Sequence, residues 1–569
     1  MVKARREARG AGRLTTAAER RFVLLGTLLA VVITSLPYVV GAALSDDERV
    51  FSGFVYAVND CTSYIAKMRQ GAEGAWLFHI PYTPEPHPGA LFFIFHRLLG
   101  KAATLLPWGD LTRRLIWVYH AARVAFGAGL LLTIYRFLAL LTWRVEVRRL
   151  AWLLITFGGG LGWVLIALGE PDWLGSTPLD FILPEGFTFL VLFAFPHLAL
   201  AQMALLLGLA QVMKAWGVQP GSGGSKERAA TRTERGAAAT RGSWLRQALL
   251  AGILWLGMGM IVPFYPAVAW SVTGAAWTML CIRREHICLP EGLAVAVATL
   301  IPLPIVMYAL WRFASDPVYA TWAAQSQVVS PHPLHYALAY GVLLALGALA
   351  VRDAWASDGP LWVALAWIIV VPMLIYLPLK EQRRFVVGFQ IPIAALAARG
   401  LRRVTNADTK LREVRWWLSA LGVLLLLLPT NAMLIGRTML AVRAHPSPIY
   451  RDRDEIATLD WLSRRVRADD VILASHESGN YIPARVGARV FVGHGAESFE
   501  ASKKRACVAR FFGGAADDEW RRELLNRYDV DYLFWGPLER ELGDFDPDAA
   551  PYLERQYGQG GYVIFQVEL

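Results

Sequence analysis

The sequence predicts an all-α membrane bundle of about eleven transmembrane helices, followed by a small α/β domain. Apolar side chains make up 55% of the 569 residues without counting glycine, which exceeds the share in soluble domains. The 22 tryptophans fit a chain with many membrane interfaces. Near residue 445 the long apolar runs stop, and the composition becomes that of a soluble domain. We therefore expect a multi-pass protein of the cell membrane.

The net charge of +11 indicates membrane orientation, and we expect no nucleic-acid partner. Most lysines and arginines lie in short segments between apolar runs. The basic segment 1–21 is therefore placed in the cytosol. The run Phe22 to Leu44 is long enough to span a bilayer and longer than a signal-peptide core. The four cysteines are too few for a disulfide framework, and unpaired thiols are expected.

Residues 22–444 are expected to form the transmembrane domain. The run 248–281 is counted as two short helices because Pro263 and Pro266 break it. The glycines of FGGGLGW, in the third run, would let helices approach closely. An odd number of spans places the C-terminus outside the cytosol. The expected spans are about 22–44, 115–143, 150–168, 188–216, 248–281 (two), 289–311, 336–351, 361–377, 385–398 and 416–435.

Three segments outside the spans differ in composition. Residues 45–114 form a first extracytoplasmic loop that is much longer than usual connections, and we interpret it as the roof of an active site. Residues 217–246 are rich in Gly, Ala, Ser, Thr and Arg and predict a disordered cytosolic loop. Residues 445–569 predict an extracytoplasmic α/β domain, with helices at 454–466 and 518–528 and strands at 471–475, 489–493, 530–535 and 561–567.

Asp60 is the first candidate for chemistry. It begins NDCTSYIAKM near the start of an expected short amphipathic helix on the membrane surface. A helix N-terminus favours an ionised carboxylate. The competing interpretation is an ordinary helix N-cap, which taken alone is favoured about two to one.

Glu85 and His87 form a second candidate, in YTPEPHPG. The three prolines would hold this piece extended, and a carboxylate and an imidazole two residues apart can share a divalent cation. A proline-rich turn with solvated polar residues explains the pattern equally well.

Arg383 and Arg384, with Lys380, place three positive charges at an outside boundary, against the bias kept elsewhere. A charge at the membrane without a local partner indicates function, and the guanidinium fork suits a phosphate or pyrophosphate. Snorkelling to ordinary lipid phosphates is the alternative.

Second choices lie on and near the second and fourth spans. His120 and Arg123 fall on one helix face, and if buried they would need an acid. The outside segment 170–187 supplies Asp180 and Glu185, and His197 opens the fourth span close by.

These motifs resemble the polyprenyl-phosphate-dependent glycosyltransferases of the GT-C superfamily, which include protein mannosyltransferases, aminoarabinose transferases and RgtA/B/C/D-like enzymes. DCTSY (60–64) resembles their signature of an aspartate, three residues and Tyr64. EPHP (85–88) resembles their acidic residue before a proline pair. Two departures stand out, since Cys61 replaces the usual second acid and His87 interrupts the prolines. The resemblance covers about residues 20–435.

The resemblance implies a GT-C-like bundle and an inverting sugar transfer from a polyprenyl-phosphate donor to an extracytoplasmic glycan, lipid or protein. It implies that Asp60 is the general base. Arg383 and Arg384 would stabilise the departing phosphate, with a divalent cation near Glu85 as a further aid.

Two other functions compete with sugar transfer. A transporter or flippase of a lipid-linked saccharide would also need arginines near a head group, although only one pair of broken helices is visible. Alternatively, the membrane part is an anchor and the C-terminal domain binds a carbohydrate or protein. SHESGN (475–480) and GHGAES (493–498) follow strands, where open α/β sheets place ligands.

Overall fold

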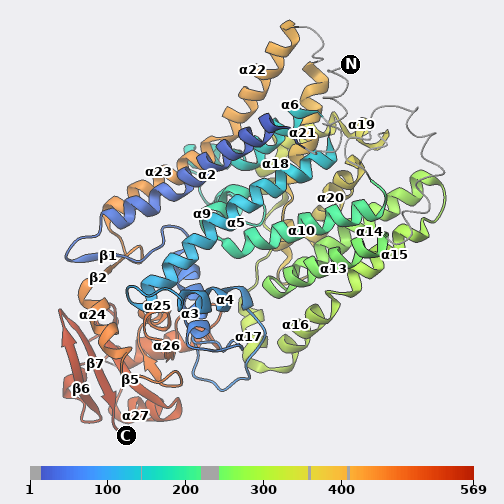
Figure 1. Cartoon of the computed structure of the whole chain (residues 1–569). Helices are drawn as coiled ribbons and strands as arrows, with labels where there is room; N and C mark the ends of the chain where they lie inside the picture. Colours follow the sequence, from blue (N-terminus) through green and yellow to red (C-terminus); the bar gives the residue numbers. More distant parts are fainter. Residues whose placement is uncertain (1–14, 143, 219–242, 357–359, 406–409, 515) are drawn as a thin grey trace. The chain divides into compact units, whose positions relative to one another are not determined.

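The computed structural model describes residues 15–142, 144–218, 243–356, 360–405, 410–514 and 516–569. They divide into two compact units (Figure 1). The first comprises 1–35, 122–309 and 328–436, and the second comprises 36–121, 310–327 and 437–569. The expected disordered loop and the basic N-terminus lie largely outside the described residues.

Helices make up the first unit, and four helices contribute residues to both units: α2 (Ala17–Ala43), α5 (Leu111–Leu141), α16 (Leu303–Ser315) and α23 (Pro429–Ala444). The others are α6 (Val145–Phe157), α7 (Gly162–Ala167), η1 (Trp173–Gly175), α8 (Leu179–Ile182), α9 (Thr188–Ala194), α10 (Pro196–Ala215), α13 (Ser243–Ile261), α14 (Tyr265–Arg284), α15 (Leu289–Leu300), α18 (Pro333–Ala348), α19 (Val351–Ala356), α20 (Leu361–Leu374), η2 (Gln382–Val386), α21 (Gln390–Thr405) and α22 (Lys410–Leu427).

Four of these helices are long and apolar enough to cross a membrane: α2, α5, α10 and α13. Two bent pairs raise the number to six within the described residues. They are α15 with α16, bent by 43°, and the part of α22 from Glu413 with α23, bent by 40°. Helices α18 and α20 are apolar but shorter. The chain is thus a multi-span helical protein, and the expected count of about eleven is not confirmed.

Breaks in the apolar runs follow the glycines and prolines. The expected hairpin near Pro263 is present, because α13 ends at Ile261 and α14 begins at Tyr265. The expected third span is not one helix, since α6 ends at Phe157 and α7 begins at Gly162. The intervening turn lies close to other main chain, and a Cβ on Gly160 would come within 2.6 Å of the Ala339 carbonyl oxygen. The glycines therefore form a turn, and they allow the close approach of a helix, α18, that the sequence suggested.

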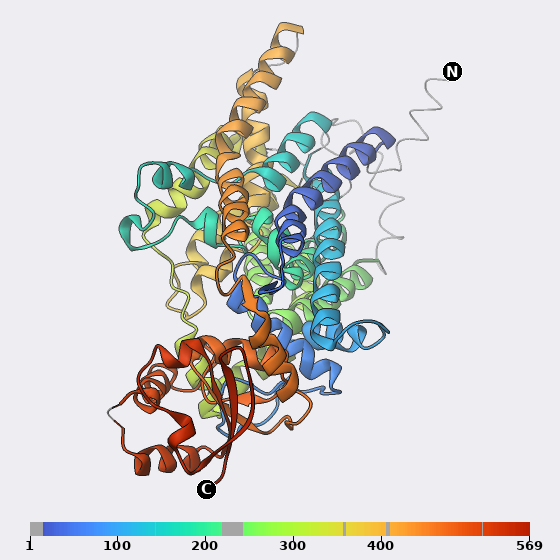
Figure 2. The ribbon, with the colours of Figure 1, turned by 90° about the vertical axis from the view of Figure 1, so that its left-hand side faces the viewer.

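The second unit contains the predicted α/β domain, with sheet order β4-β3-β5-β7-β6. The strands are β3 (Val471–Leu473), β4 (Arg489–Val490), β5 (Val530–Trp535), β6 (Leu553–Gln559) and β7 (Tyr562–Val567). β3 runs parallel to β4 and β5, whereas β7 runs antiparallel to β5 and β6. Figure 2 shows the last strands side by side, in red. The four predicted strands are present, and β6 was missed because most of its side chains are polar and exposed.

Helices cover this sheet and complete the unit. Phe491, Phe511 and Leu533 lie at the centre of its apolar core. The remaining elements are β1 (Arg49–Phe51), α3 (Val58–Ala72), α4 (Ile94–Ala103), α17 (Pro317–Gln325), β2 (Tyr450–Asp452), α24 (Arg453–Leu462), α25 (His476–Arg485), α26 (Ala501–Phe512), α27 (Asp518–Arg527), α28 (Pro537–Arg540) and η3 (Pro547–Ala549).

The first loop and the α/β domain belong to the same unit and are joined by main-chain bonds. Strand β1 pairs with β2. The Val490 amide of the edge strand β4 donates to the Pro81 carbonyl at 2.9 Å. Helix α3 packs against both α4 and α25. A Cβ on Gly100 of α4 would overlap the Met68 carbonyl, so only glycine permits this approach. α3 is therefore not a surface amphipathic helix, since Lys67 and Arg69 are buried.

Candidate functional site

Asp60 lies in the first turn of α3, and its side chain is 56% exposed. The N-cap position is Ala57, with a φ of 46°, and no side chain caps the helix. The N-cap interpretation of Asp60 is therefore wrong, because the left-handed residue sets the start of the helix three residues earlier. The role of this carboxylate therefore lies in contacts other than capping.

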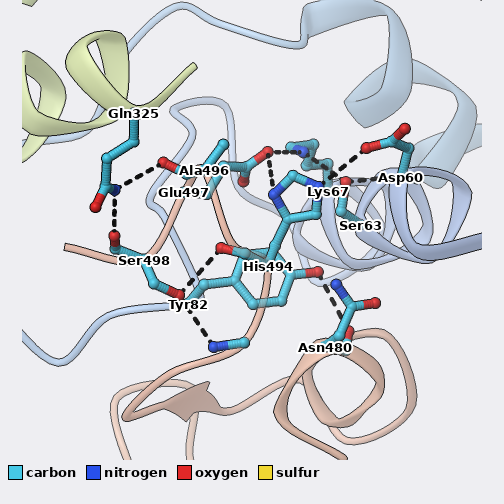
Figure 3. A network of polar contacts seen from close by, with 11 residues as sticks. Asp60, Ser63, Lys67, Tyr82, Gln325, Asn480, His494, Ala496, Glu497 and Ser498 are labelled. Atoms are coloured by element: carbon cyan, nitrogen blue, oxygen red, sulfur yellow. Dashed lines mark hydrogen bonds and ion pairs between the residues drawn. The ribbon is translucent and has the colours of Figure 1, made fainter. Parts of the chain in front are cut away.

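His494 contacts Asp60 from the turn that follows β4 (Figure 3). Its Nε2 lies 3.1 Å from Asp60 Oδ1. An ionised carboxylate only accepts hydrogen bonds, so the ring donates through Nε2–H. The His494 side chain is 15% exposed. The sequence indicated this turn only as part of GHGAES, with no relation to Asp60, which lies 434 residues away.

A buried ion pair joins the same helix to the same turn. Lys67 Nζ lies 2.6 Å from Glu497 Oε1 and 3.0 Å from Ser63 Oγ. The side chains of Lys67 and Glu497 are 0% and 4% exposed. The Glu497 carboxylate also lies 3.8 Å from His494 Nδ1. Asp60, Ser63 and Lys67 thus lie along one side of α3 and meet His494 and Glu497 (Figure 3).

The turn at 493–498 is fixed from several sides. Ser498 donates its amide and its hydroxyl to the His494 carbonyl, at 2.9 and 3.1 Å. Gln325 of α17 donates to the carbonyls of Ala496 and Ser498, at 3.2 and 2.6 Å. A Cβ on Gly493 would lie 2.5 Å from the Gly479 carbonyl oxygen, so no larger residue fits there. The direction of the His494 ring is set by this framework.

Glu85 and His87 do not form the shared cation site that the sequence suggested. Glu85 Oε2 accepts from Lys504 Nζ at 2.6 Å and from the Thr83 hydroxyl. His87 Nε2 accepts from the Ile80 amide at 2.8 Å, and Nδ1 lies 2.8 Å from the Glu85 carbonyl. Burial lowers the pKa of His87, which keeps the ring neutral.

With these contacts, Glu85 and His87 do not fit a metal ion. Both nitrogens of His87 face partners within the protein, and an ammonium group neutralises Glu85. Within the described ranges, no group of three or more His, Cys, Asp or Glu side chains is placed to hold a metal ion.

Lys504 is a buried cation that sequence analysis did not single out. Its Nζ lies 5.0 Å from the centre of the Phe491 ring. Burial lowers its pKa to about 8, and the neighbouring Glu85 carboxylate opposes that shift. It joins α26 to the proline-rich piece of the first loop.

Tyr64 ends the DCTSY motif, and its ring stacks on that of His96 at 4.6 Å. Cys61 is buried, with its sulfur 3.8 Å from the Tyr119 hydroxyl. All four cysteines are free, as expected. The motif therefore places Asp60 toward the exposed side of α3 and Cys61 toward its packed side.

His120 and Arg123 contact main-chain carbonyls. His120 Nε2 lies 2.8 Å from the Gly53 carbonyl oxygen. Arg123 donates to the carbonyls of Thr34 and Leu192 and, at 3.0 Å, to the Ser35 hydroxyl.

The acids suggested as partners of His120 and Arg123 have other contacts. Asp180 accepts from the amides of Gly160 and Gly162 and from the Thr430 hydroxyl, at 2.9, 3.1 and 2.7 Å. It holds the glycine turn between α6 and α7. His197 is buried at the start of α10.

The arginines at 383 and 384 lie in η2, between α20 and α21. Arg384 Nε is 3.9 Å from Glu185 Oε1, so this arginine has a local acid, contrary to expectation. Its guanidinium also lies 5.9 Å from the centre of the Phe264 ring, beside the break between α13 and α14. Lys380 is exposed, and its carbonyl accepts from the Val328 amide. Two candidate residues, Glu185 and Arg384, are thus neighbours.

The carboxyl ends of β3 and β5 form the usual ligand position of an open α/β sheet. Here Glu539 of α28 takes that position. Its buried carboxylate accepts from the amides of Ser475 and Gly536, both at 2.9 Å. The amides of Ser475 and Gly536 at this position are therefore occupied by the chain itself.

Comparison with solved structures gives the class of fold. The oligosaccharyltransferase of Archaeoglobus fulgidus, in its apo form, matches with a TM-score of 0.52 at 12% identity, over 95% of this chain and 74% of that one. The same protein tethered to an acceptor peptide matches with a TM-score of 0.50 at 12% identity, over 90% and 68%. ArnT from Cupriavidus metallidurans, bound to undecaprenyl phosphate, matches at 0.47 and 10% identity, over 95% and 97%.

The two matches to the oligosaccharyltransferase show that this chain has the same fold as that enzyme, in agreement with the fold expected from DCTSY and the order of parts. Because the sequence identity is only 12%, the likeness establishes the fold alone. No family model matches the chain, and no curated protein matches its sequence significantly.

Proposed function

We propose that this protein is an integral-membrane glycosyltransferase of the GT-C type. It moves a sugar from a polyprenyl-phosphate donor to a glycan, lipid or protein acceptor outside the cytosol. The fold likeness to an oligosaccharyltransferase supports a transferase, and the DCTSY motif supports a lipid-linked donor. The N-terminus lies in the cytosol and the α/β domain on the other side, in keeping with the distribution of basic residues.

Asp60 is the general base in this proposal. Its carboxylate takes the proton of the acceptor hydroxyl while the oxygen attacks the anomeric carbon. The bond from that carbon to the phosphate oxygen breaks, and the sugar is transferred with inversion. The bonding electrons leave with the polyprenyl phosphate.

Arg383 and Arg384, with Lys380, stabilise the negative charge that develops on the leaving phosphate. Glu185, 3.9 Å away, keeps a carboxylate near the Arg384 guanidinium before the donor binds. We assign no step to a metal ion at Glu85 and His87, because the contacts of these two side chains within the protein do not fit one.

One observation carries the assignment of Asp60. The carboxylate is exposed, is not the helix cap, and is nevertheless held by a side chain from the far end of the sequence. A solvated surface acid needs no such partner.

The test is Asp60→Asn in the reconstituted protein, supplied with synthetic polyprenyl-phosphate hexoses and pentoses. Release of polyprenyl phosphate should fall by about 100- to 10,000-fold, the range that general-base catalysis contributes. Asp47→Asn is the matched control, because Asp47 is a fully exposed acid of the same loop. Membrane insertion and yield should be unchanged in both variants. Full transfer by Asp60→Asn would refute the assignment.

A further inference from the structure

We propose that His494 is a positioning residue for Asp60, so that the C-terminal domain completes the catalytic site. The inference rests on the proposed function, since it deepens the role given to Asp60. It assigns a task to the GHGAES turn, which lies outside the part of the chain that carries the family resemblance.

The contact between the two side chains is made by a built arrangement. Along α3, Asp60 and Lys67 are separated by two helical turns. Along the facing turn, His494 and Glu497 are separated by three residues. Each member of one pair contacts a member of the other, at 3.1 Å and 2.6 Å (Figure 3). The register between helix and turn is therefore fixed at two points.

The Lys67–Glu497 and His494–Asp60 contacts differ in burial, and from this difference we infer different roles. The pair of Lys67 and Glu497 is buried, so losing either partner would leave an uncompensated charge. It holds the turn on the helix. The contact of His494 with Asp60 lies at the exposed edge, where a polar pair adds little to stability. What this second contact does provide is a fixed direction for the Asp60 carboxylate.

Orientation of the carboxylate matters for the proposed reaction. A carboxylate that rotates freely about its side-chain bonds spends little time aligned with an acceptor hydroxyl. With Oδ1 bound by the His494 N–H, the group is held in one orientation before the acceptor arrives. His494 does not touch substrate or exchange a proton in this proposal; it acts through Asp60.

The test compares His494→Leu with His494→Gln. Leucine removes the donor, whereas the glutamine side chain can present an N–H close to the position of Nε2. Release of polyprenyl phosphate from the same donors should show a kcat lower by about 10- to 100-fold in His494→Leu, with KM unchanged. His494→Gln should recover most of this loss. His476→Leu is the matched control, a histidine that follows the neighbouring strand β3, and it should leave kcat unchanged.

Other outcomes separate this inference from the proposed function. An unchanged kcat in His494→Leu, with Asp60→Asn inactive, would overturn the positioning role alone. A raised KM with an unchanged kcat would also overturn it, because it would indicate substrate binding. Full activity of Asp60→Asn would overturn both. If His494→Leu fails to fold, His494→Asn serves instead, since it stays polar but is too short to reach Asp60 and should show the same loss of kcat.

Discussion

Replacing Lys67 by methionine is expected to loosen helix α3 and the turn 493–498 together. Lys67 is fully buried, and its Nζ lies 2.6 Å from Glu497 Oε1 and 4.2 Å from the centre of the Phe93 ring. In Lys67→Met, the methionine fills much of the same volume, but Glu497 loses its cation while only 4% exposed. Breaking a buried pair in this way costs about 3–5 kcal/mol.

Hydrogen exchange followed by mass spectrometry measures this loss where it occurs. The free energy of local opening is read from the amides of 58–72 and 493–498. Since about 1.4 kcal/mol corresponds to a factor of ten, exchange in these two segments should become roughly 100- to 4,000-fold faster. The peptides of β6 and β7 report on the sheet away from the pair and should change least.

The double variant Lys67→Met, Glu497→Gln is the control. It also removes the negative charge of Glu497, which Lys67→Met leaves buried without its cation. The double variant should therefore be less destabilised than Lys67→Met alone. Exchange at the wild-type rate in Lys67→Met would refute the reasoning. So would a double variant whose loss equals the sum of the two single losses, because the two side chains would then not be coupled.

Two further predictions concern other charged groups. The pKa of Lys504 lies near 8 in the folded protein against 10.5 in the unfolded chain, so the folded state releases this proton first. The contribution of Lys504 to the free energy of unfolding should therefore rise between about pH 8 and pH 10. Thermal midpoints of wild type and Lys504→Met measure it, and a constant difference across that range would contradict it. Arg383→Ala should weaken binding of a polyprenyl phosphate by about 10- to 100-fold with little change in thermal midpoint; unchanged affinity would reassign Arg383 to ordinary lipid contact.

The sequence was sufficient for the features that local patterns determine. The change of composition near 445 located the α/β domain, and short apolar runs located β5 and β7. The prolines at 263 and 266 located the break between α13 and α14. The sequence was insufficient at FGGG, because glycines inside an apolar run fit both a packed helix and a turn. The turn is explained by the contacts of Gly160 with Asp180 and Ala339, which are distant in the sequence.

The candidate site depended on contacts that no local pattern contains. The motif DCTSY was enough to single out Asp60, but its partner lies 434 residues away. Glu85 was also singled out, yet its partner Lys504 lies 419 residues away, and so a metal was considered where an ammonium group sits. In both cases the acid belongs to the first loop, and the partner belongs to the α/β domain. The missing half of each interaction could be known only from the fold.

The α/β domain contacts the first loop through elements that would have no such partner in an isolated α/β domain. Its edge strand β4 bonds to Pro81, its turn at 493–498 bonds to α3, and its helix α26 provides Lys504 to Glu85. Its ordinary ligand position is occupied by Glu539. A domain whose binding position is filled, and whose edge is bonded to a loop, is suited to hold that loop. This explains how a first loop as long as 45–114 can present Asp60 in a fixed geometry.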